Sequence, residues 1–174
     1  MSYTSAPILE TENLVLRGPE AKDVESIIRF LQDEKRSKGF GHIPERGNAW
    51  RWFALLVGHW HIRGYGYFSI QTKSGAFAGL AGVWNPEDWP EPELGWAVFS
   101  DFEGKSIAYE ASYRVRNWAC EELGFQKLAS TIFKGNSRSI KLASRLEAKV
   151  EKHYNSPFFG GDVILYRHPS QKEN

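Results

Sequence analysis

The clearest change in hydrophobic pattern lies between Glu93 and Leu123. Residues 94–99 are apolar or small and uncharged, which predicts a strand covered on both faces. From Ile107 onward, apolar residues recur every three or four positions, and this spacing predicts an amphipathic helix. The residues of that stripe are Ile107, Ala108, Ala111, Val115, Trp118 and Ala119. Gly104 lies between strand and helix, where the backbone must turn sharply.

A turn of this kind predicts a phosphate site. A strand that enters a helix through a short turn directs several unpaired amide hydrogens, and the positive end of the helix dipole, at one place. The trio Gly104, Lys105 and Ser106 also matches the end of a nucleotide-binding P-loop. That loop needs a glycine five positions earlier, where this chain has Phe99. A nucleoside triphosphate is therefore not the expected ligand.

The same patterns predict the elements before this turn. Residues 1–9 are expected to be a loose lead-in, and residues 34–48 a charged, glycine-containing loop. Residues 85–92 hold three prolines and three acidic residues, which predicts a stiff polar loop. The expected elements are a strand at 11–17, helices at 24–31 and 50–60, and strands at 65–71 and 76–84.

After the amphipathic helix, Gly124 is expected to end the helix. The expected elements that follow are a strand at 127–133, a short helix at 136–146, and strands at 150–154 and 163–166. The polar residues from His168 onward are expected to fray.

Composition narrows the class of protein. A chain of 174 residues with 41% hydrophobic and 25% charged residues is expected to form one domain, residues 1–174, of ordinary globular type. A net charge of +1 gives no reason to expect nucleic acid or an anionic membrane as a partner. Cys120 is the single cysteine, and we interpret it as a structural thiol. Without a recognisable leader sequence, the expected compartment is the cytoplasm.

The strand, turn and helix together resemble a known family. The run Glu93, Leu94, Gly95, Trp96 and the run from Phe102 to Ala111 are closely similar to the Glu-Ile-Gly-Tyr strand and the Trp-Gly-Lys-Gly-Tyr-Ala-Thr-Glu-Ala turn of one branch of the GNAT superfamily. That branch contains ribosomal-protein N-terminal acetyltransferases. In the superfamily's shorter signature, Gly104 matches, whereas Asp101 and Ser106 replace Gln or Arg and Gly or Ala.

The resemblance implies an α/β (α+β) fold and a cosubstrate. The fold would have a mixed, mostly antiparallel sheet of about seven strands, with about four helices on both faces. The cosubstrate would be acetyl-CoA, with no metal. By this resemblance Trp96, Ala97 and Val98 supply backbone contacts to the pantetheine arm, with an amide near Val98 polarising the thioester. The pyrophosphate would meet the amides of Gly104, Lys105, Ser106, Ile107 and Ala108.

Two positions in the short helix bear on the same expectation. Asn136 matches the family's asparagine that contacts the pantetheine arm, and Ser139 follows at a small-residue position. A plain helix cap is the alternative role for Asn136, because asparagine is favoured there. The family's tyrosine that protonates the leaving thiolate corresponds to Ala143. Ser139, a water or no protein group would then serve as the acid.

The chemistry of amide formation needs a group that removes a proton from the acceptor amine. Some relatives place a carboxylate where Glu93 begins its strand, so Glu93 is either this base or a surface glutamate at a strand end. The resemblance puts the acceptor beside the two early helices and their loop. The expected acceptor-side residues are Phe40, His42, Trp50, Trp52 and Trp84. The histidines His42, His59 and His61 have no ligand-like spacing with Cys, Asp or Glu, so no metal site is expected.

Two functions follow as alternatives. The first is an N-acetyltransferase acting on a small-molecule or peptide amine, with the branch resemblance favouring a protein or peptide N-terminus. The second is a relative of the same fold that binds acetyl-CoA without catalysis, as a sensor or scaffold. The sequence leaves the oligomeric state open, with a homodimer among the alternatives.

Overall fold

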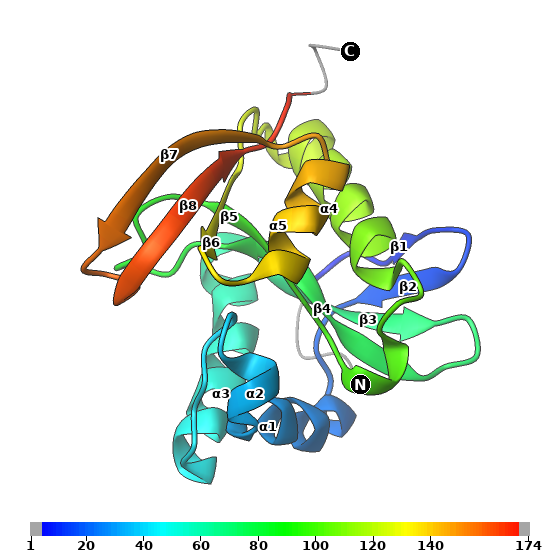
Figure 1. The fold of residues 1–174 in the computed structure, drawn as a ribbon. Helices are drawn as coiled ribbons and strands as arrows, with labels where there is room; N and C mark the ends of the chain where they lie inside the picture. Colours follow the sequence, from blue (N-terminus) through cyan, green and yellow to red (C-terminus); the bar gives the residue numbers. More distant parts are fainter. Residues whose placement is uncertain (1–4, 171–174) are drawn as a thin grey trace.

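The structure is a computed structural model that describes residues 5–170, and one mixed sheet runs through them (Figure 1). Within these residues the strands are β1 (Leu9–Glu10), β2 (Leu14–Arg17), β3 (Tyr67–Thr72), β4 (Phe77–Trp84), β5 (Glu93–Val98), β6 (Ala129–Phe133), β7 (Lys149–Ser156) and β8 (Gly161–Arg167). The helices are α1 (Val24–Gln32), α2 (Glu34–Ser37), α3 (Arg46–Arg63), α4 (Ile107–Leu123) and α5 (Ser137–Arg145). Two short 3-10 turns, η1 (Ala21–Asp23) and η2 (Ser100–Phe102), precede α1 and α4.

The strand order is β1-β2-β3-β4-β5-β6-β8-β7, and all neighbours are antiparallel except β5 and β6. The predicted element order is confirmed, with two additions. The two-residue β1 begins at the last residue of the segment 1–9 expected to be a loose lead-in, of which residues 1–4 lie outside the described residues. The one-turn α2 lies in the segment expected to be a loop, with Asp33 Oδ1 accepting a hydrogen bond from the amide of Arg36 (3.1 Å).

The sheet separates two hydrophobic cores. In Figure 1, α4 and α5 lie on one face and α1, α2 and α3 on the other. The first core joins α4 and the end of α5 to the sheet through Ile107, Val115, Trp118 and Leu146, among others. The second core joins α1 and α3 to the opposite face through Ile27, Leu31, Phe53, Leu56, Leu80 and Ala97, among others. Side chains of β5 alternate between these cores, as expected for a strand covered on both faces.

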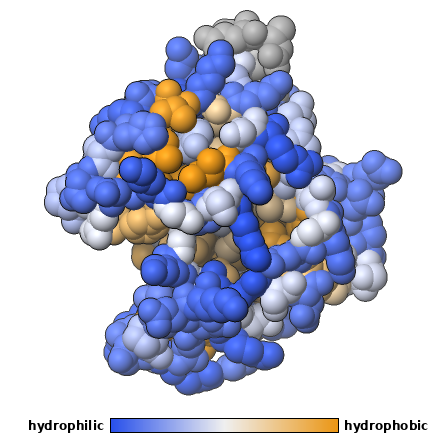
Figure 2. All heavy atoms as spheres, viewed as in Figure 1, coloured by the Kyte–Doolittle hydropathy of each residue, from blue (hydrophilic) through white to orange (hydrophobic). Residues whose placement is uncertain are grey.

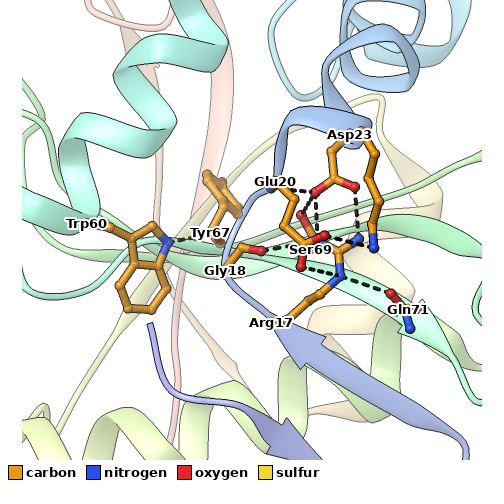
Figure 3. A network of polar contacts seen from close by, with 9 residues as sticks. Arg17, Gly18, Glu20, Asp23, Trp60, Tyr67, Ser69 and Gln71 are labelled. Atoms are coloured by element: carbon orange, nitrogen blue, oxygen red, sulfur yellow. Dashed lines mark hydrogen bonds and ion pairs between the residues drawn. The ribbon is translucent and has the colours of Figure 1, made fainter. Parts of the chain in front are cut away.

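A buried ion pair fixes α1 against the sheet (Figure 3). Arg17 at the end of β2 donates two hydrogen bonds to Asp23, from Nη1 to Oδ2 (2.7 Å) and from Nη2 to Oδ1 (2.8 Å). The Ser69 hydroxyl on β3 donates to the same Oδ2 (2.8 Å). Removing one partner of such a buried pair leaves an uncompensated charge, which typically costs about 3–5 kcal/mol. The helical layer that holds α1 is therefore firmly joined to β2 and β3.

The prediction that the chain frays from His168 is wrong for residues 168–170, whereas residues 171–174, which it also covered, lie outside the described residues. The His168 side chain is buried, and its amide donates a hydrogen bond to the carbonyl of Leu128 (2.9 Å). The single hydroxyl hydrogen of Ser130 is donated to the carbonyl of Leu94 (2.6 Å), so His168 Nε2, 2.8 Å from that hydroxyl, must be the donor. Burial, followed by the charges of Arg116 and Arg167, lowers the pKa of His168 to about 3. The ring is therefore neutral, and it holds the Ser130 hydroxyl that joins β6 to β5.

The part of the chain that the structure describes contains no helix long and apolar enough to cross a membrane.

Candidate active site

The site begins where β5 and β6 separate. These two parallel strands share one residue pair, Glu93 with Ala129. Beyond it, β5 stays paired with β4 as far as Val98, and β6 stays paired with β8 as far as Phe133. Each strand is therefore paired only along its outer edge, which opens a gap between them. We call this gap, between residues 94–98 and residues 130–133, the fork. Backbone groups along its inner edges can pair with an extended ligand, as an exposed sheet edge does.

Side chains occupy the base of the fork. The Glu93 carboxylate accepts a hydrogen bond from the Thr131 hydroxyl (2.5 Å) and another from the Thr131 amide (3.4 Å). The Ser130 hydroxyl bonds the Leu94 carbonyl, as described above. These side-chain bonds take the place of the next rungs of the β5–β6 ladder. The residues at 93 and 130 thus keep the two strands connected where their backbones diverge.

Glu93 is also the electrostatic centre of the site. Its side chain is 8% exposed, and burial raises its pKa to about 7. The bonds from Thr131 act in the opposite direction and lower the pKa, whereas the charge of Glu91 raises it. The indole N–H of Trp89 also lowers this pKa. The Nε1 atom is buried but has no partner in hydrogen-bond geometry among the described residues. A carboxyl group with a pKa near 7 can accept and release protons at neutral pH.

The predicted phosphate site lies at the start of α4. Gly104 and Ser106 both have left-handed backbone conformations, with φ of +73° and +58°. The first intrahelical bond of α4 runs from the Glu110 amide to the Ser106 carbonyl (3.0 Å). No side chain caps this helix, so the amides before residue 110 at its first turn are available to a ligand. Residues 104–106 are exposed, and a β-carbon on Gly104 would meet nothing within 4 Å. An anion therefore has both room and donors here.

Of the two acidic residues in this turn, Glu103 has its carboxylate engaged by arginines. Glu103 Oε1 accepts hydrogen bonds from Arg36 of α2 (2.5 Å) and from Arg138 of α5 (2.6 Å). This arrangement links the phosphate turn to helices from both sides of the fork. Asp101 is exposed, and its backbone carbonyl accepts a hydrogen bond from Lys105 Nζ (3.1 Å).

The residues expected in the short helix α5 lie beside the fork. Asn136 caps this helix, with Oδ1 accepting from the Ser139 amide (3.2 Å), so the capping role predicted as its alternative is confirmed. Its Nδ2 lies against Gly39, where an added β-carbon would be only 2.3 Å away. Ser139 Oγ accepts a hydrogen bond from Trp96 Nε1 (3.3 Å), which connects α5 to β5. Ala143 is fully buried against β6 and β8.

Three of the expected acceptor-side residues form one aromatic cluster. Ring centroids are 5.6 Å apart for Phe40 and Trp52, and 5.8 Å apart for Trp52 and Trp84. Tyr67 packs against all three. Trp50 is 55% exposed and lies outside the buried cores. His42 is held to α1, with Nδ1 3.0 Å from the Leu31 carbonyl. Figure 2 shows apolar side chains in a hollow between the surface of β7 and β8 and that of α1–α3.

Tyr67 and Thr131 were not among the site residues expected from the sequence. Both depend on strand pairing over long distances in the chain, which local periodicity does not show. Gly95 was a partial indication of the Tyr67 contact, because a glycine inside a strand often marks a place where another group approaches the backbone closely. A β-carbon on Gly95 would lie 2.0 Å from the Tyr67 hydroxyl oxygen.

Within residues 5–170, no three His, Cys, Asp or Glu side chains come together as a metal site. His59 instead stacks on Trp84 with centroids 4.5 Å apart. Its Nδ1 lies 2.7 Å from the Tyr65 carbonyl, and its Nε2 accepts from the Asn85 amide (3.1 Å). Burial lowers the pKa of His59, so the ring is a neutral part of the core.

Several solved structures share the overall fold of this chain. An acetyltransferase from Agrobacterium tumefaciens is 29% identical, with a TM-score of 0.85 over 95% of this chain and 96% of that one. A GNAT-family acetyltransferase from Bordetella pertussis is 23% identical, with a TM-score of 0.78 over 94% and 99%. The ribosomal L7/L12 α-N-protein acetyltransferase, solved with coenzyme A, shares the fold at 14% identity, with a TM-score of 0.78 over 94% and 98%.

A family model described as an acetyltransferase (GNAT) domain matches residues 13–149. That span includes the fork, the phosphate turn and the helices on both faces of the sheet. The chain therefore belongs to the GNAT acetyltransferase family.

Proposed function

We propose that this protein is an N-acetyltransferase that moves the acetyl group of acetyl-CoA to a primary amine by direct attack in a ternary complex. The observation that carries the proposal is the fork itself. Two adjacent parallel strands part after a single pair, and they do so between a turn of free amides and a carboxyl group with a pKa of about 7.

Acetyl-CoA fits the residues present. The amides of Gly104, Lys105, Ser106, Ile107 and Ala108 would hold its diphosphate, because the uncapped helix start supplies donors and positive potential. The inner edge of β5 at Trp96, Ala97 and Val98 would pair with its extended pantetheine arm. Asn136 would bond the same arm through Nδ2, since Oδ1 is used by the helix cap. When bound, acetyl-CoA supplies an acetyl group activated as a thioester.

Glu93 has the properties that a general base requires. At neutral pH its carboxyl group is about half ionised, so it can take the proton that the acceptor amine must lose. Its side chain lies on the same face of β5 as Ala97, which belongs to the core formed by α1 and α3. The proton would thus be removed from the side of the fork where the aromatic cluster lies. Ser139, bonded to Trp96, is the proposed acid on the other side.

The proposed acceptor is an amine that enters between the sheet and the α1–α3 layer. Phe40 and Trp52 are partly exposed there, with Trp84 buried behind them, and aromatic rings attract cationic amines. Among amines, a protein or peptide N-terminus is favoured by the fold shared with the ribosomal L7/L12 α-N-protein acetyltransferase. Trp50 and His42 would contact only the more distant parts of such an acceptor.

A thiol-release assay with a panel of N-terminal peptides and small amines tests the proposal. We expect acetyl-CoA consumption that depends on the acceptor, with a mass increase of one acetyl group on the amine. Calorimetry with acetyl-CoA is measured in parallel. Tight binding without turnover of any acceptor would instead support the alternative, a sensor or scaffold, which the buried Ala143 in place of an acid favours. An absence of binding would refute both.

A further inference from the structure

The hydroxyl group of Tyr67 has no assigned role in the site described above. Its ring is buried among the cluster residues, with centroids 5.3 Å from Phe40, 6.4 Å from Trp52 and 5.2 Å from Trp84. Its hydroxyl has no hydrogen-bond partner among the described residues 5–170, and its oxygen is not one of the fully buried polar atoms that lack a partner there, so it is open to solvent. The ring is thus packed while the tip of the phenol stays accessible. A fixed donor of this kind is placed to bond a ligand.

The position of the hydroxyl is set by Gly95. Because a β-carbon at residue 95 would lie 2.0 Å from the hydroxyl oxygen and 2.9 Å from the carbon that carries it, no other amino acid fits without moving the ring. Gly95 follows the last β5–β6 pair by two residues. The phenol therefore reaches β5 where the fork opens, on the face of the strand that also carries Glu93.

The backbone of Tyr67 is held as firmly as its ring. Trp60 on α3 is 1% exposed, and its Nε1 donates a hydrogen bond to the Tyr67 carbonyl (2.9 Å; Figure 3). Tyr67 also begins the pairing of β3 with β4, opposite Gly82. With ring and backbone both fixed, the hydroxyl is pre-organised rather than free to follow a ligand.

The surroundings also keep the proton on this phenol. Burial, followed by the charge of Glu93, raises the pKa of Tyr67 far above neutral pH. A phenol of this kind keeps its proton at neutral pH, so it serves as a hydrogen-bond donor there and not as a base. Glu93 and Tyr67 thus offer complementary chemistry at the base of the fork: a carboxyl group that titrates near pH 7 and a donor that does not titrate there.

We propose that Tyr67 is a catalytic residue whose hydroxyl donates a hydrogen bond to the acyl group during its transfer. The proposal rests on the acetyltransferase function proposed above. Tyr67 keeps its proton throughout, so no bond of the tyrosine forms or breaks. A fixed donor that meets developing negative charge in a water-poor site contributes about 10²–10³-fold to kcat. Tyr67 would supply stabilisation in a site where Ala143 supplies none.

The test compares Tyr67→Phe with a matched control, Tyr65→Phe. Tyr65 lies two residues earlier and packs against Phe125 and His59, in the other core. Both changes remove one hydroxyl and keep the ring. We expect kcat to fall about 100-fold in Tyr67→Phe and to stay within about twofold in Tyr65→Phe. Thermal midpoints and the calorimetric Kd for coenzyme A should match wild type in both.

A binding measurement gives a second readout that does not depend on turnover. The hydroxyl should favour acetyl-CoA over coenzyme A, because only the former carries the acyl group. Loss of one neutral hydrogen bond changes affinity by about 2- to 10-fold. We expect Tyr67→Phe to reduce the preference for acetyl-CoA by that factor and Tyr65→Phe to leave it unchanged. An unchanged kcat and an unchanged preference in a folded Tyr67→Phe protein would overturn the proposal.

Two further outcomes are decided by the same set of proteins. If Tyr67→Phe does not fold, Gly95→Ala provides the test, since the added methyl group must displace the hydroxyl while the tyrosine is kept. Loss of rate and of acetyl-CoA preference in that variant supports the role, and wild-type values refute it. If wild type transfers acetyl to no amine, the proposed function has failed. The acetyl-CoA preference of Tyr67→Phe then still shows whether the hydroxyl contacts the acyl group.

Discussion

The Glu93 carboxylate bridges two strands by accepting hydrogen bonds from both the hydroxyl and the amide of Thr131. In a continuous parallel ladder, the backbone of β5 would supply the acceptor for a β6 amide. Here the side chain of β5 supplies it, and the backbones are free to diverge. Glu93 thus combines a structural task with the chemical task proposed for it. The two tasks can be separated by experiment.

Replacing Glu93 with Gln should lower kcat about 10²-fold at pH 7 without weakening coenzyme A binding, because a neutral amide cannot take the amine proton. In wild type, the carboxyl group is protonated below its pKa of about 7, so kcat/KM should fall about tenfold per unit as the pH drops below 7. This fall in kcat/KM, the acidic limb of the pH profile, should vanish in Glu93→Gln. Pre-steady-state rates from pH 5.5 to 9 with one acceptor measure it. An identical profile in both proteins would leave Glu93 with a structural task alone.

The Thr131 hydroxyl should also affect the pH at which kcat/KM falls. Its bonds to Glu93 lower the pKa of the carboxyl group, so Thr131→Val, which keeps the shape and removes the hydroxyl, should move the acidic limb of kcat/KM to higher pH. Thr131→Ser keeps the donor and serves as the control, with a limb at the wild-type position. The pH–rate profiles of the two variants give the comparison. A shift to lower pH in Thr131→Val would contradict the assignment of the limb to Glu93.

The protein should become more stable when Ser106 is replaced by glycine. A left-handed conformation costs a non-glycine residue about 1–2 kcal/mol, part of which is offset by the greater freedom of glycine in the unfolded chain. Ser106→Gly and the matched variant Glu147→Gly, whose φ is +62°, should each raise the free energy of unfolding by about 0.5–1 kcal/mol. Urea titration measures both. Destabilisation of Ser106→Gly alone would mean that the serine side chain contributes a contact of its own to the folded turn.

Glu103 should oppose the binding of phosphate groups. Its carboxylate neutralises Arg36 and Arg138 beside the free amides, so Glu103→Gln should leave two guanidinium groups available to an anion. We expect severalfold tighter coenzyme A binding at low salt and a smaller gain at 0.5 M salt, where screening is stronger. Asp101→Asn removes a nearby exposed charge without freeing an arginine and should change the Kd less. Weaker binding by Glu103→Gln would show that the carboxylate orients the arginines for the ligand.

Much of the fold could be predicted because its main elements are long and periodic. The stripe on α4 and the uncharged run of β5 define their own secondary structure. The two-residue β1 shows no such pattern, since it exists through its pairing of Leu9 with Leu16. The single turn of α2 is equally too short for a periodic signal. Both were therefore absent from the predicted elements.

The backbone parts of the site could be predicted from the sequence, whereas most contacts between its side chains could not. Gly104 and the start of α4 are contiguous in sequence, and the resemblance also identified Glu93. Tyr67 reaches Gly95 only because β3, β4 and β5 are neighbours, and no local pattern shows that contact. His168 was predicted to begin a frayed end because its sequence neighbours are polar, whereas a serine 38 residues away provides its partner.

The bond between His168 and Ser130 also sets an order for biosynthesis. A nascent chain emerging from the ribosome releases β5, α4 and β6 well before residue 168. Until β8 has followed, the outer edge of β6 is unpaired, and the imidazole that supports the Ser130–Leu94 bridge is missing. The fork can therefore reach its final shape only after His168 has left the ribosome and β8 has folded onto β6. Until then, any exposed part of β6 is an open edge that can pair with another unfinished copy.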